Sequence, residues 1–426
     1  MKLEKYIKVI DFNQEKILCN TINKSIVTIK ADMIKNRNLL TYKFKREELD
    51  YLEKNCFTNN IYNKNHFNNN LKIPTTIIIN ITENCNINCL YCYQNSFYSK
   101  NSGISKNTVK FVLKYVNKII DLGQKEFYIY FFGGEPLLFK EKIIYIKRLL
   151  DEIALKQSVS IKYGLGSNSI LLTENFLNEF ESLNIDTTLT LDNDHNFMRP
   201  CRYIKDTHRI IIENLSTANK KENINIHIGY NTHKKNLEEF DKFLYLLKSY
   251  GLNNVNVSMD YIDNYKFNSF HNDLSIRDFL KWKSSIGLEL LINNGFYIYD
   301  SPFYSSSNLC NAHDKYSIKF FSDGSVGLCN YTSYIDRIKN PTIENILILK
   351  KELYNIGKKS KEHFRCKNCN DYGICRGLIY CNNYKCSTNN AYDFNYYIKE
   401  YVKQVRKGNS KFFLDMWYYE KIFIRK

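Results

Sequence analysis

The fold of this chain is decided by the stretch Thr75-Thr-Ile-Ile-Ile-Asn-Ile-Thr82, which is followed two residues later by Cys85-Asn-Ile-Asn-Cys89-Leu-Tyr-Cys92. Residues 75–82 are rich in β-branched side chains, which is typical of a buried strand. The cysteines therefore follow the carboxyl end of a strand, where α/β barrels place their chemistry. Three such thiolates can hold three irons of a cubane cluster and leave the fourth iron open, whereas a structural zinc site fills every position. A zinc loop is the alternative for this spacing taken alone.

Strand and helix patterns alternate after this stretch, in units of roughly 30 residues. We expect strands at residues 75–82, 126–132, 158–164, 186–191, 224–230 and 254–259. Helical periodicity falls near residues 105–122, 140–156, 173–183, 203–218, 236–250 and 276–293. Six such units predict an α/β fold with a parallel barrel, complete or partial.

The two ends of the chain differ from this repeat. Residues 1–70 predict a small unit and an Asn-rich linker, with strands at 6–12, 15–19 and 25–29, a helix at 45–55 and a winged-helix-like order. The barrel is expected at residues 71–299. Residues 300–426 are rich in cysteine, and residues 392–419 read as a final helical stretch.

Composition narrows the class of protein. The chain has 426 residues, a net charge of +17 and 13 cysteines. It contains no apolar run near the ~20 residues of a membrane span and no signal-peptide core at its start, so we expect a cytoplasmic protein that uses cysteine for metal or redox chemistry. The positive charge indicates either a lysine-rich solvated surface or an acidic partner; no nucleic-acid-binding module is recognisable. Cys19, Cys56 and Cys201 lie apart from the clusters and read as ordinary buried or half-buried thiols.

The cysteine loop resembles the Cys-x3-Cys-x2-Cys signature of the radical S-adenosylmethionine (SAM) superfamily, including an aromatic residue, Tyr91, before the last cysteine. The resemblance implies a partial barrel of the TIM type and a [4Fe-4S] cluster on Cys85, Cys89 and Cys92, whose open iron binds SAM. It also assigns the run Gly133-Gly134-Glu135-Pro136 to the methionyl amino group of SAM, with Glu135 as acceptor. The alternative is a strand-to-helix turn with Pro136 at the helix start.

Weaker similarities follow the next strands. Residues 167–169 resemble the Thr-Asn-Gly of the family, with Ser169 in place of glycine, and Asn168 is a candidate contact for the SAM ribose or carboxylate. Asp192 lies in a run similar to Ser-Leu-Asp-Gly and is a candidate site carboxylate. Either Arg199 or Arg202 is expected to reach the SAM carboxylate, and Asn231 is a further, weaker candidate.

The second group of cysteines resembles the SPASM extension of radical SAM peptide maturases, which holds two auxiliary [4Fe-4S] clusters. The resemblance assigns three ligands to the first cluster, namely Cys310, Cys329 and Cys381, with His313 or Asp314 as possible additions. It assigns four to the second, namely Cys366, Cys369, Cys375 and Cys386. The last cysteines are spaced differently from the family pattern, and a zinc ribbon on Cys366, Cys369 and two later cysteines is the alternative.

These resemblances imply an enzyme that forms a 5′-deoxyadenosyl radical and modifies a peptide. The expected activity is a peptide maturase that installs a thioether or other cross-link in a ribosomally made precursor. Its leader would bind the N-terminal unit by strand addition, and flavodoxin or ferredoxin would supply electrons. The alternatives are an anaerobic sulfatase-maturing enzyme and a basic iron–sulfur or zinc binding protein without SAM chemistry. Asp260 and Asp263, after the sixth strand, are candidate catalytic acids or bases.

Overall fold

The structure is a computed structural model in which most of the chain is described. The described residues are 1–4, 7–21, 25–55, 57–58, 75–92, 103–201, 203–262, 270–298, 314–328, 337–360 and 394–413. Among the described helices, none has the length and apolar character that crossing a membrane requires.

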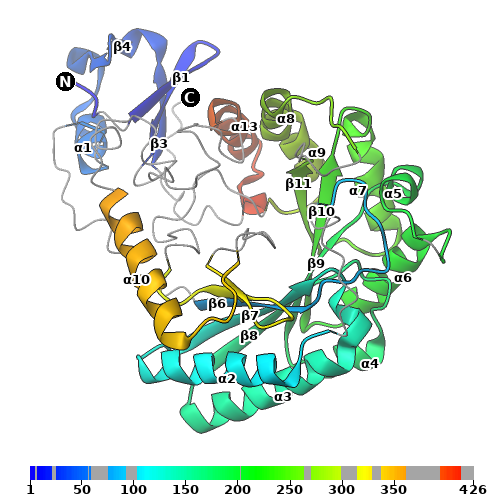
Figure 1. Cartoon of the computed structure of the whole chain (residues 1–426). Coiled ribbons are helices and arrows are strands. Elements are labelled where there is room, and N and C mark those ends of the chain that lie inside the picture. Colours follow the sequence, from blue (N-terminus) through cyan, green and yellow to red (C-terminus); the bar gives the residue numbers. More distant parts are fainter. Residues whose placement is uncertain are drawn as a thin grey trace.

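One sheet of eight strands forms the centre of the molecule (Figure 1). Its strand order is β11-β10-β9-β8-β7-β6-β12-β13, and β6 to β11 are parallel throughout. These six strands are β6 (Thr75–Thr82), β7 (Glu126–Gly133), β8 (Ser160–Gly166), β9 (Leu183–Thr188), β10 (Ile224–Thr232) and β11 (Asn256–Tyr261). The predicted partial barrel of six strand–helix units is confirmed.

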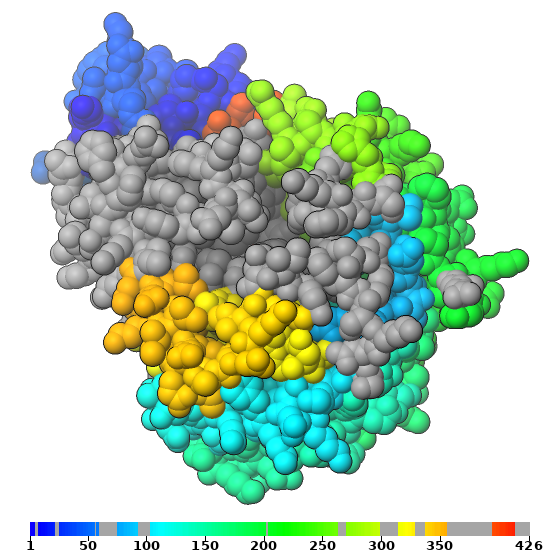
Figure 2. Space-filling model, viewed as in Figure 1, coloured from blue at the N-terminus to red at the C-terminus, as the bar shows by residue number. Residues whose placement is uncertain are grey.

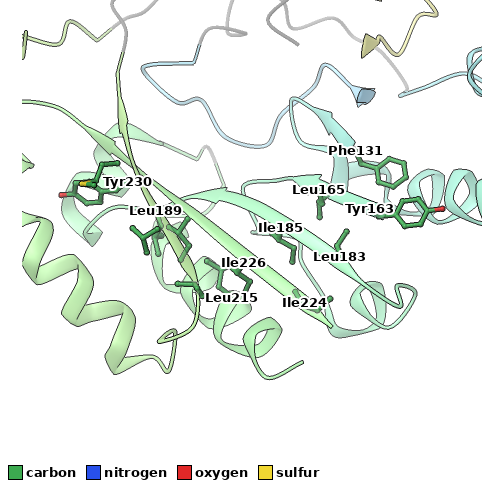
Figure 3. Packing of buried hydrophobic residues seen from close by; sticks show 14 of the residues in the cluster. Phe131, Tyr163, Leu165, Leu183, Ile185, Leu189, Leu215, Ile224, Ile226 and Tyr230 are labelled. Carbon is green, nitrogen blue, oxygen red and sulfur yellow. The ribbon is translucent and has the colours of Figure 1, made fainter. Parts of the chain in front are cut away.

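Helices cover the outer face of this sheet, and the apolar core lies between the two layers (Figure 1). The helices are α2 (Lys106–Asp121), α3 (Lys140–Gln157), α4 (Glu174–Leu177), α5 (Asp192–Met198), α6 (Thr207–Asn219), α7 (Phe240–Ser249), α8 (Ile276–Trp282) and α9 (Leu288–Asn293). Figure 3 shows buried side chains of β7 to β10, such as Phe131, Leu165, Ile185 and Ile226, which belong to the same apolar cluster as Leu215 of α6. Alternate strand residues point into this layer because side chains alternate along a strand.

Two short strands extend the sheet beyond β6. β12 (Ile318–Phe320) pairs in parallel with β6, and β13 (Val326–Gly327) pairs antiparallel with β12. Ser322, in the turn between them, donates its backbone N–H (3.2 Å) and its hydroxyl to the carboxylate of Glu83. Residues after 300 therefore contact the start of the cysteine loop. The sequence pattern did not predict these strands, because they are only two and three residues long.

The N-terminal unit has the predicted order of three strands and a helix. Strands β1 (Ile7–Phe12), β2 (Glu15–Asn20) and β3 (Ile26–Lys30) form an antiparallel sheet, followed by a two-stranded ribbon, β4 (Ile34–Lys35) and β5 (Asn38–Leu39), and by α1 (Arg46–Lys54). The unit has its own apolar core, which includes Leu18, Val27, Leu52 and Phe57. It forms a lobe at one end of the molecule, far from α2 and α3 (Figure 2).

Two further helices lie near this lobe: α10 (Ile343–Ser360) and α13 (Phe394–Arg406). Arg406 of α13 donates to Glu15 (2.6 Å) and to the Thr28 hydroxyl (3.1 Å), and its guanidinium lies 5.3 Å from the ring centre of Phe12. On its other side α13 contacts the helical segment 283–287, and Lys403 pairs with Glu289 at 2.9 Å. α13 thus joins the N-terminal unit to the barrel.

Several predicted elements differ in detail from the observed ones. The helix expected at 173–183 is a single turn, α4, and the strand expected at 186–191 lies three residues earlier, as β9. The expected helix 276–293 is interrupted by a π-helical turn, Lys283–Gly287. The helix α5 was not predicted. Of the final helical stretch, α13 is confirmed, and residues 414–419 lie outside the described residues.

Candidate active site

The start of the cysteine loop packs against two glycines, Gly133 and Gly134. Gly134 N–H donates to the Thr82 carbonyl at 2.8 Å, and Glu135 N–H donates to the Asn84 carbonyl at 2.7 Å. A Cβ atom on Gly133 would lie 2.0 Å from the Thr82 carbonyl oxygen, and one on Gly134 would lie 2.3 Å from that of Asn84. The two glycines therefore admit the backbone of the cysteine loop itself, and their predicted contact with SAM stays a prediction.

Glu135 joins the loops that follow β7 and β8. Its carboxylate is fully buried and accepts from the backbone N–H of Leu137 (2.9 Å), the hydroxyl of Ser167 (2.8 Å) and the backbone N–H of Asn168 (2.7 Å). Burial raises the pKa of Glu135, and these three donors act against that rise. Pro136 starts a 3-10 helix, Pro136–Phe139, which the Glu135 side chain caps. The turn reading of this run is therefore correct, and contact of Glu135 with SAM stays a prediction.

Asn168 connects this network to the cysteine loop. Its amide nitrogen donates to the Asn86 side chain at 2.7 Å and lies 3.8 Å from the Cys85 sulfur, while its oxygen accepts from Ile170 N–H. Ser169, where the family carries glycine, has a φ of 63°, in the left-handed region that glycine adopts without a steric penalty. Ser169 therefore adopts a backbone conformation that glycine would also allow.

The three thiols lie on one loop and influence one another. Cys85, Cys89 and Cys92 are all half-buried. Burial, with the neighbouring charges of Glu135 and the two other cysteines, raises the pKa of Cys85 to about 12. Within the described part of the chain, no set of three or more His, Cys, Asp or Glu side chains already surrounds a metal position. Cluster binding would therefore deprotonate these thiols and draw them together.

Residues 198–201 run alongside the cysteine loop in the opposite direction. Leu90 N–H donates to the Met198 carbonyl and Asn88 N–H to the Pro200 carbonyl, both at 2.9 Å. The Cys201 thiol donates to the Asn86 carbonyl at 3.3 Å. Cys201 is half-buried, as expected, but it contacts the site, which its isolated position in the sequence did not indicate.

Arg199 lies in the middle of residues 198–201, and its side chain is 5% exposed. Its guanidinium donates to the Thr188 carbonyl and hydrogen-bonds with the Cys89 sulfur, and it is close enough to Tyr91 for their charges to interact. Tyr91 in turn hydrogen-bonds with the side chain of Asn231 at the end of β10, and burial raises the pKa of its hydroxyl. The structure thus brings together Tyr91, Arg199 and Asn231, three of the predicted cofactor contacts. Arg202 lies outside the described residues.

Asp192 is exposed at the start of α5, and its neighbour Asp194 is the more enclosed carboxylate. Asp194 accepts from His233 (2.7 Å) and from the Asn236 amide (3.1 Å), which ties α5 to the loop after β10. Burial raises the pKa of Asp194, but the bonds and charge of His233, with Asn236 and Thr190, outweigh it and hold the pKa below its usual value. The sequence did not single out this pair, since Asp194 and His233 are far apart in the chain.

Of the two candidate catalytic aspartates, Asp260 lies on β11, where its carboxylate accepts from the Ser258 hydroxyl at 2.9 Å. Its position is opposite Asn231 in the parallel register. Asp263 lies outside the described residues, as do all seven cysteines expected to hold auxiliary clusters. Asp314 is described, and its carboxylate accepts the backbone N–H groups of Tyr316 and Ser317.

The donor set of the loop fits an iron–sulfur cluster. Three thiols at the carboxyl edge of a parallel sheet supply the ligands that such clusters use. The amide of Asn168 and the guanidinium of Arg199 lie beside the Cys85 and Cys89 sulfurs, and N–H groups near cluster sulfurs are a common second layer of such sites. The buried Nε of Arg199 has no hydrogen-bond partner in the described structure and is free to bind an added group.

Comparison with known proteins agrees with this site. Residues 79–244 match the model of the radical SAM superfamily. The radical SAM cyclopropyl synthase TigE of Paramaledivibacter caminithermalis is 26% identical over 214 residues, which span 46% of this chain and 43% of TigE. The match thus covers less than half of that relative.

Two solved structures share the fold. The anSMEcpe structure with bound AdoMet superimposes with a TM-score of 0.61 at 17% identity, covering 79% of this chain and 100% of that one. Streptococcus suis SuiB bound to its precursor peptide SuiA gives a TM-score of 0.51 at 17% identity, covering 97% and 99%.

The matched segment contains the cysteine loop, the Gly-Gly-Glu-Pro run, Asn168 and Arg199. In this superfamily it implies SAM and a [4Fe-4S] cluster as cofactors, as predicted. Residues 79–244 of this chain are therefore a radical SAM domain, the domain that defines this superfamily of enzymes.

Proposed function

We propose that this protein is a peptide maturase, which uses its radical SAM domain to install a thioether or other cross-link in a ribosomally made precursor peptide. The observation that carries the proposal is the combination of the cysteine loop with a separate N-terminal unit that has an apolar groove beside the edge strand β3. TigE and SuiB, whose names describe a cyclopropyl synthase and a protein with a precursor peptide, are consistent with it.

Cys85, Cys89 and Cys92 would hold a [4Fe-4S] cluster, which together with SAM would supply the chemistry for abstracting hydrogen from an unactivated C–H group. The chain's own residues bind and orient. Tyr91, Asn168 and Arg199 lie around the loop and would contact the SAM molecule, while Glu135 holds the loops after β7 and β8 together. Asp260 lies near the carboxyl end of β11 and would transfer a proton to or from the substrate.

The N-terminal groove lies between β3 and α1 and encloses a cavity of about 350 Å³. Its lining is largely apolar, with Val27, Ile29, Met33, Phe44 and Leu52 among the contributors. β3 ends the order β1-β2-β3, so no described strand pairs with its outer edge. An unpaired strand edge beside an apolar groove is the geometry that binds an extended peptide by strand addition, with the groove taking its side chains.

The domain boundaries proposed from the sequence agree with this division of labour. Residues 1–70 would capture the leader, residues 71–299 would generate the radical, and residues 300–426 would carry the auxiliary clusters. α13 holds the N-terminal unit against the barrel through Arg406, so a peptide bound to β3 would be tethered to the same body as the cysteine loop.

The chemistry is tested with anaerobically purified protein, reduced by dithionite and supplied with SAM. We expect formation of 5′-deoxyadenosine, and its loss in Cys89→Ala. Cys19→Ala is the matched control, since Cys19 is buried in β2, away from the site. Wild-type protein that binds iron but never cleaves SAM would support the alternative of a binding protein.

The substrate is tested with synthetic peptides encoded by short reading frames next to the gene, with binding followed by fluorescence anisotropy. Tyr51→Ser, in the groove, should weaken binding at least tenfold, whereas Tyr42→Ser, an exposed residue of the same unit, should not. Mass spectrometry of the product separates the two enzyme classes. A thioether retains the cysteine sulfur, whereas formylglycine formation from cysteine, the reaction of a sulfatase-maturing enzyme, removes it.

A further inference from the structure

We infer that Arg199 sets the reduction potential of the cluster on the cysteine loop, by holding a fixed positive charge and an N–H donor beside the Cys89 sulfur. This inference rests on the proposed function, because it requires that Cys85, Cys89 and Cys92 hold a cluster. It differs from the role that the family resemblance gives Arg199, which is to bind the carboxylate of SAM.

The backbone places Arg199 opposite Cys89. Asn88 bonds to Pro200 and Leu90 bonds to Met198, so the residues on either side of Cys89 are each paired with a residue on either side of Arg199. The Cys201 thiol extends the same pairing to Asn86. The position of the arginine relative to this thiol is therefore fixed by the main chain as well as by its own side-chain contacts.

The guanidinium is enclosed and held from a second side. Arg199 is 5% exposed, and it donates to the carbonyl of Thr188, the last residue of β9. It also interacts with Cys89 and Tyr91 of the cysteine loop, and its charge acts on Cys85, Glu135 and His195. Its Nε is buried without a hydrogen-bond partner in the described structure. The bond to β9 holds the side chain in the interior, beside the cysteine loop.

A positive charge in this position has a definite electrostatic consequence. Arginine stays protonated at any working pH, and charges interact more strongly in a buried site than in water. Reduction adds a negative charge to the cluster, so a buried cation beside a ligand sulfur favours the reduced form. Hydrogen bonds to cluster sulfurs and net charge are established determinants of cluster potential.

The test is a redox titration, followed by electron paramagnetic resonance, of reconstituted full-length protein without SAM. Auxiliary clusters are removed from the signal by subtracting the spectra of a Cys85→Ala/Cys89→Ala/Cys92→Ala variant. Arg199→Gln should shift the midpoint potential of the loop cluster to a more negative value, and Arg199→Lys should restore part of the shift. Arg209→Gln is the control, since Arg209 is exposed on α6 and pairs with Glu213.

Binding of SAM is measured on the same variants by isothermal titration. If Arg199→Gln holds a full cluster at the wild-type potential, the inference is wrong. If that variant in addition binds SAM more weakly than wild type, Arg199 instead binds the SAM carboxylate. If Arg199→Gln cannot retain iron, Arg199→Met, which also lacks the charge and the donor, takes its place. A loop-cluster potential in Arg199→Met equal to that of the Arg209→Gln control would contradict the inference. If Cys89→Ala retains the loop cluster, the proposed function fails instead.

Discussion

The two halves of the carboxyl edge of the sheet use their polar groups differently. After β6, β7 and β8, the side chains of Glu135, Ser167 and Asn168 are bound to one another and to the cysteine loop. After β9, His195 lies on α5 and Arg199 directly follows it, and both are buried. The two ring nitrogens of His195 and the Nε of Arg199 have no hydrogen-bond partner in the described structure.

This difference separates scaffold from binding surface. Buried polar groups are normally hydrogen-bonded, and the network of Glu135, Ser167 and Asn168 is complete without an added group, so it serves to shape the cysteine loop. The second half has buried polar atoms without a hydrogen-bond partner in the described structure, and one of them, the Nε of Arg199, belongs to a side chain that interacts with Cys89 and Tyr91. It is therefore the side on which a cofactor gains new hydrogen bonds from the protein.

The largest expected effect comes from adding a methyl group to Gly133, against which the cysteine loop packs. Gly133→Ala places a Cβ 2.0 Å from the Thr82 carbonyl at a φ of 139°, so either β7 or the cysteine loop must move. We expect a loss of about 4 kcal/mol in the free energy of unfolding, measured with urea, together with loss of bound iron. Gly251→Ala is the control, because Gly251 also has a positive φ but nothing within 4 Å, and should cost about 1 kcal/mol. Equal costs would show that the close approach is not required.

Removing the Glu135 carboxylate is expected to have the next largest effect. Glu135→Ala leaves the Ser167 hydroxyl and two backbone N–H groups without an acceptor in a buried place, at a cost of about 3 kcal/mol. Urea unfolding measures this cost, and Glu174→Ala, which removes an exposed partner of Lys221, should cost less than about 1 kcal/mol. If Glu135→Ala kept full stability but lost SAM affinity, Glu135 would belong to the binding side instead.

Much of the first half was predictable from the sequence. Residues 75–82 are β-branched and bounded by turn residues, so the first strand and the position of the cysteine loop at its end follow from local pattern alone. Pro136 and Glu135 also have local signatures, since proline favours the first turn of a helix and an acidic residue caps it. The backbone role of the glycines was not readable, because it depends on the approach of a loop 50 residues away.

The second half was largely hidden in the sequence. Asp192 was singled out as a candidate site carboxylate, yet it begins α5, a helix that the sequence pattern did not predict. Residues 198–201 show no hydrophobic periodicity and no motif. Their hydrogen bonds to Asn88 and Leu90 form only in the folded molecule. The contact of Arg199 with Cys89 and the pairing of Asp194 with His233 likewise join residues distant in the chain, which one sequence without an alignment does not reveal.

Acid should weaken the second half through His195. Burial, together with the charges of Arg199 and His208, holds the pKa of His195 well below its ordinary value of 6.5, so the imidazole is neutral in the folded protein. The unfolded chain binds a proton below pH 6.5, and this contribution to stability is therefore present above pH 6.5 and is lost as the pH falls. Between pH 6.5 and 5.5 the loss is about 1 kcal/mol for one histidine.

The difference between the urea unfolding curves of wild type and His195→Leu across this range measures the effect. His195→Leu should lose this pH dependence, whereas His271→Leu, which removes an exposed histidine, should keep it. If His195→Leu retained the full dependence, the buried imidazole would have to be protonated or bonded, and the contrast between the two halves would weaken.

The smallest expected effect concerns Ser169, which follows β8 in the scaffold half. Ser169 has a left-handed φ of 63°, and its buried hydroxyl has no partner in the described structure. Ser169→Gly removes both penalties, while the Asn214 bond to the carbonyl of residue 169 is unaffected because it is made by the backbone. We expect a gain of about 1 kcal/mol in the free energy of unfolding.

Ser158→Gly is the matched control, since Ser158 has a φ of 51° at the exposed end of α3 and lacks the buried hydroxyl. A larger gain at 169 than at 158 would show that the unpaired hydroxyl is a defect of the scaffold, whereas a loss at 169 would mean that this hydroxyl has a partner in the assembled site and belongs, like Arg199, to the binding side.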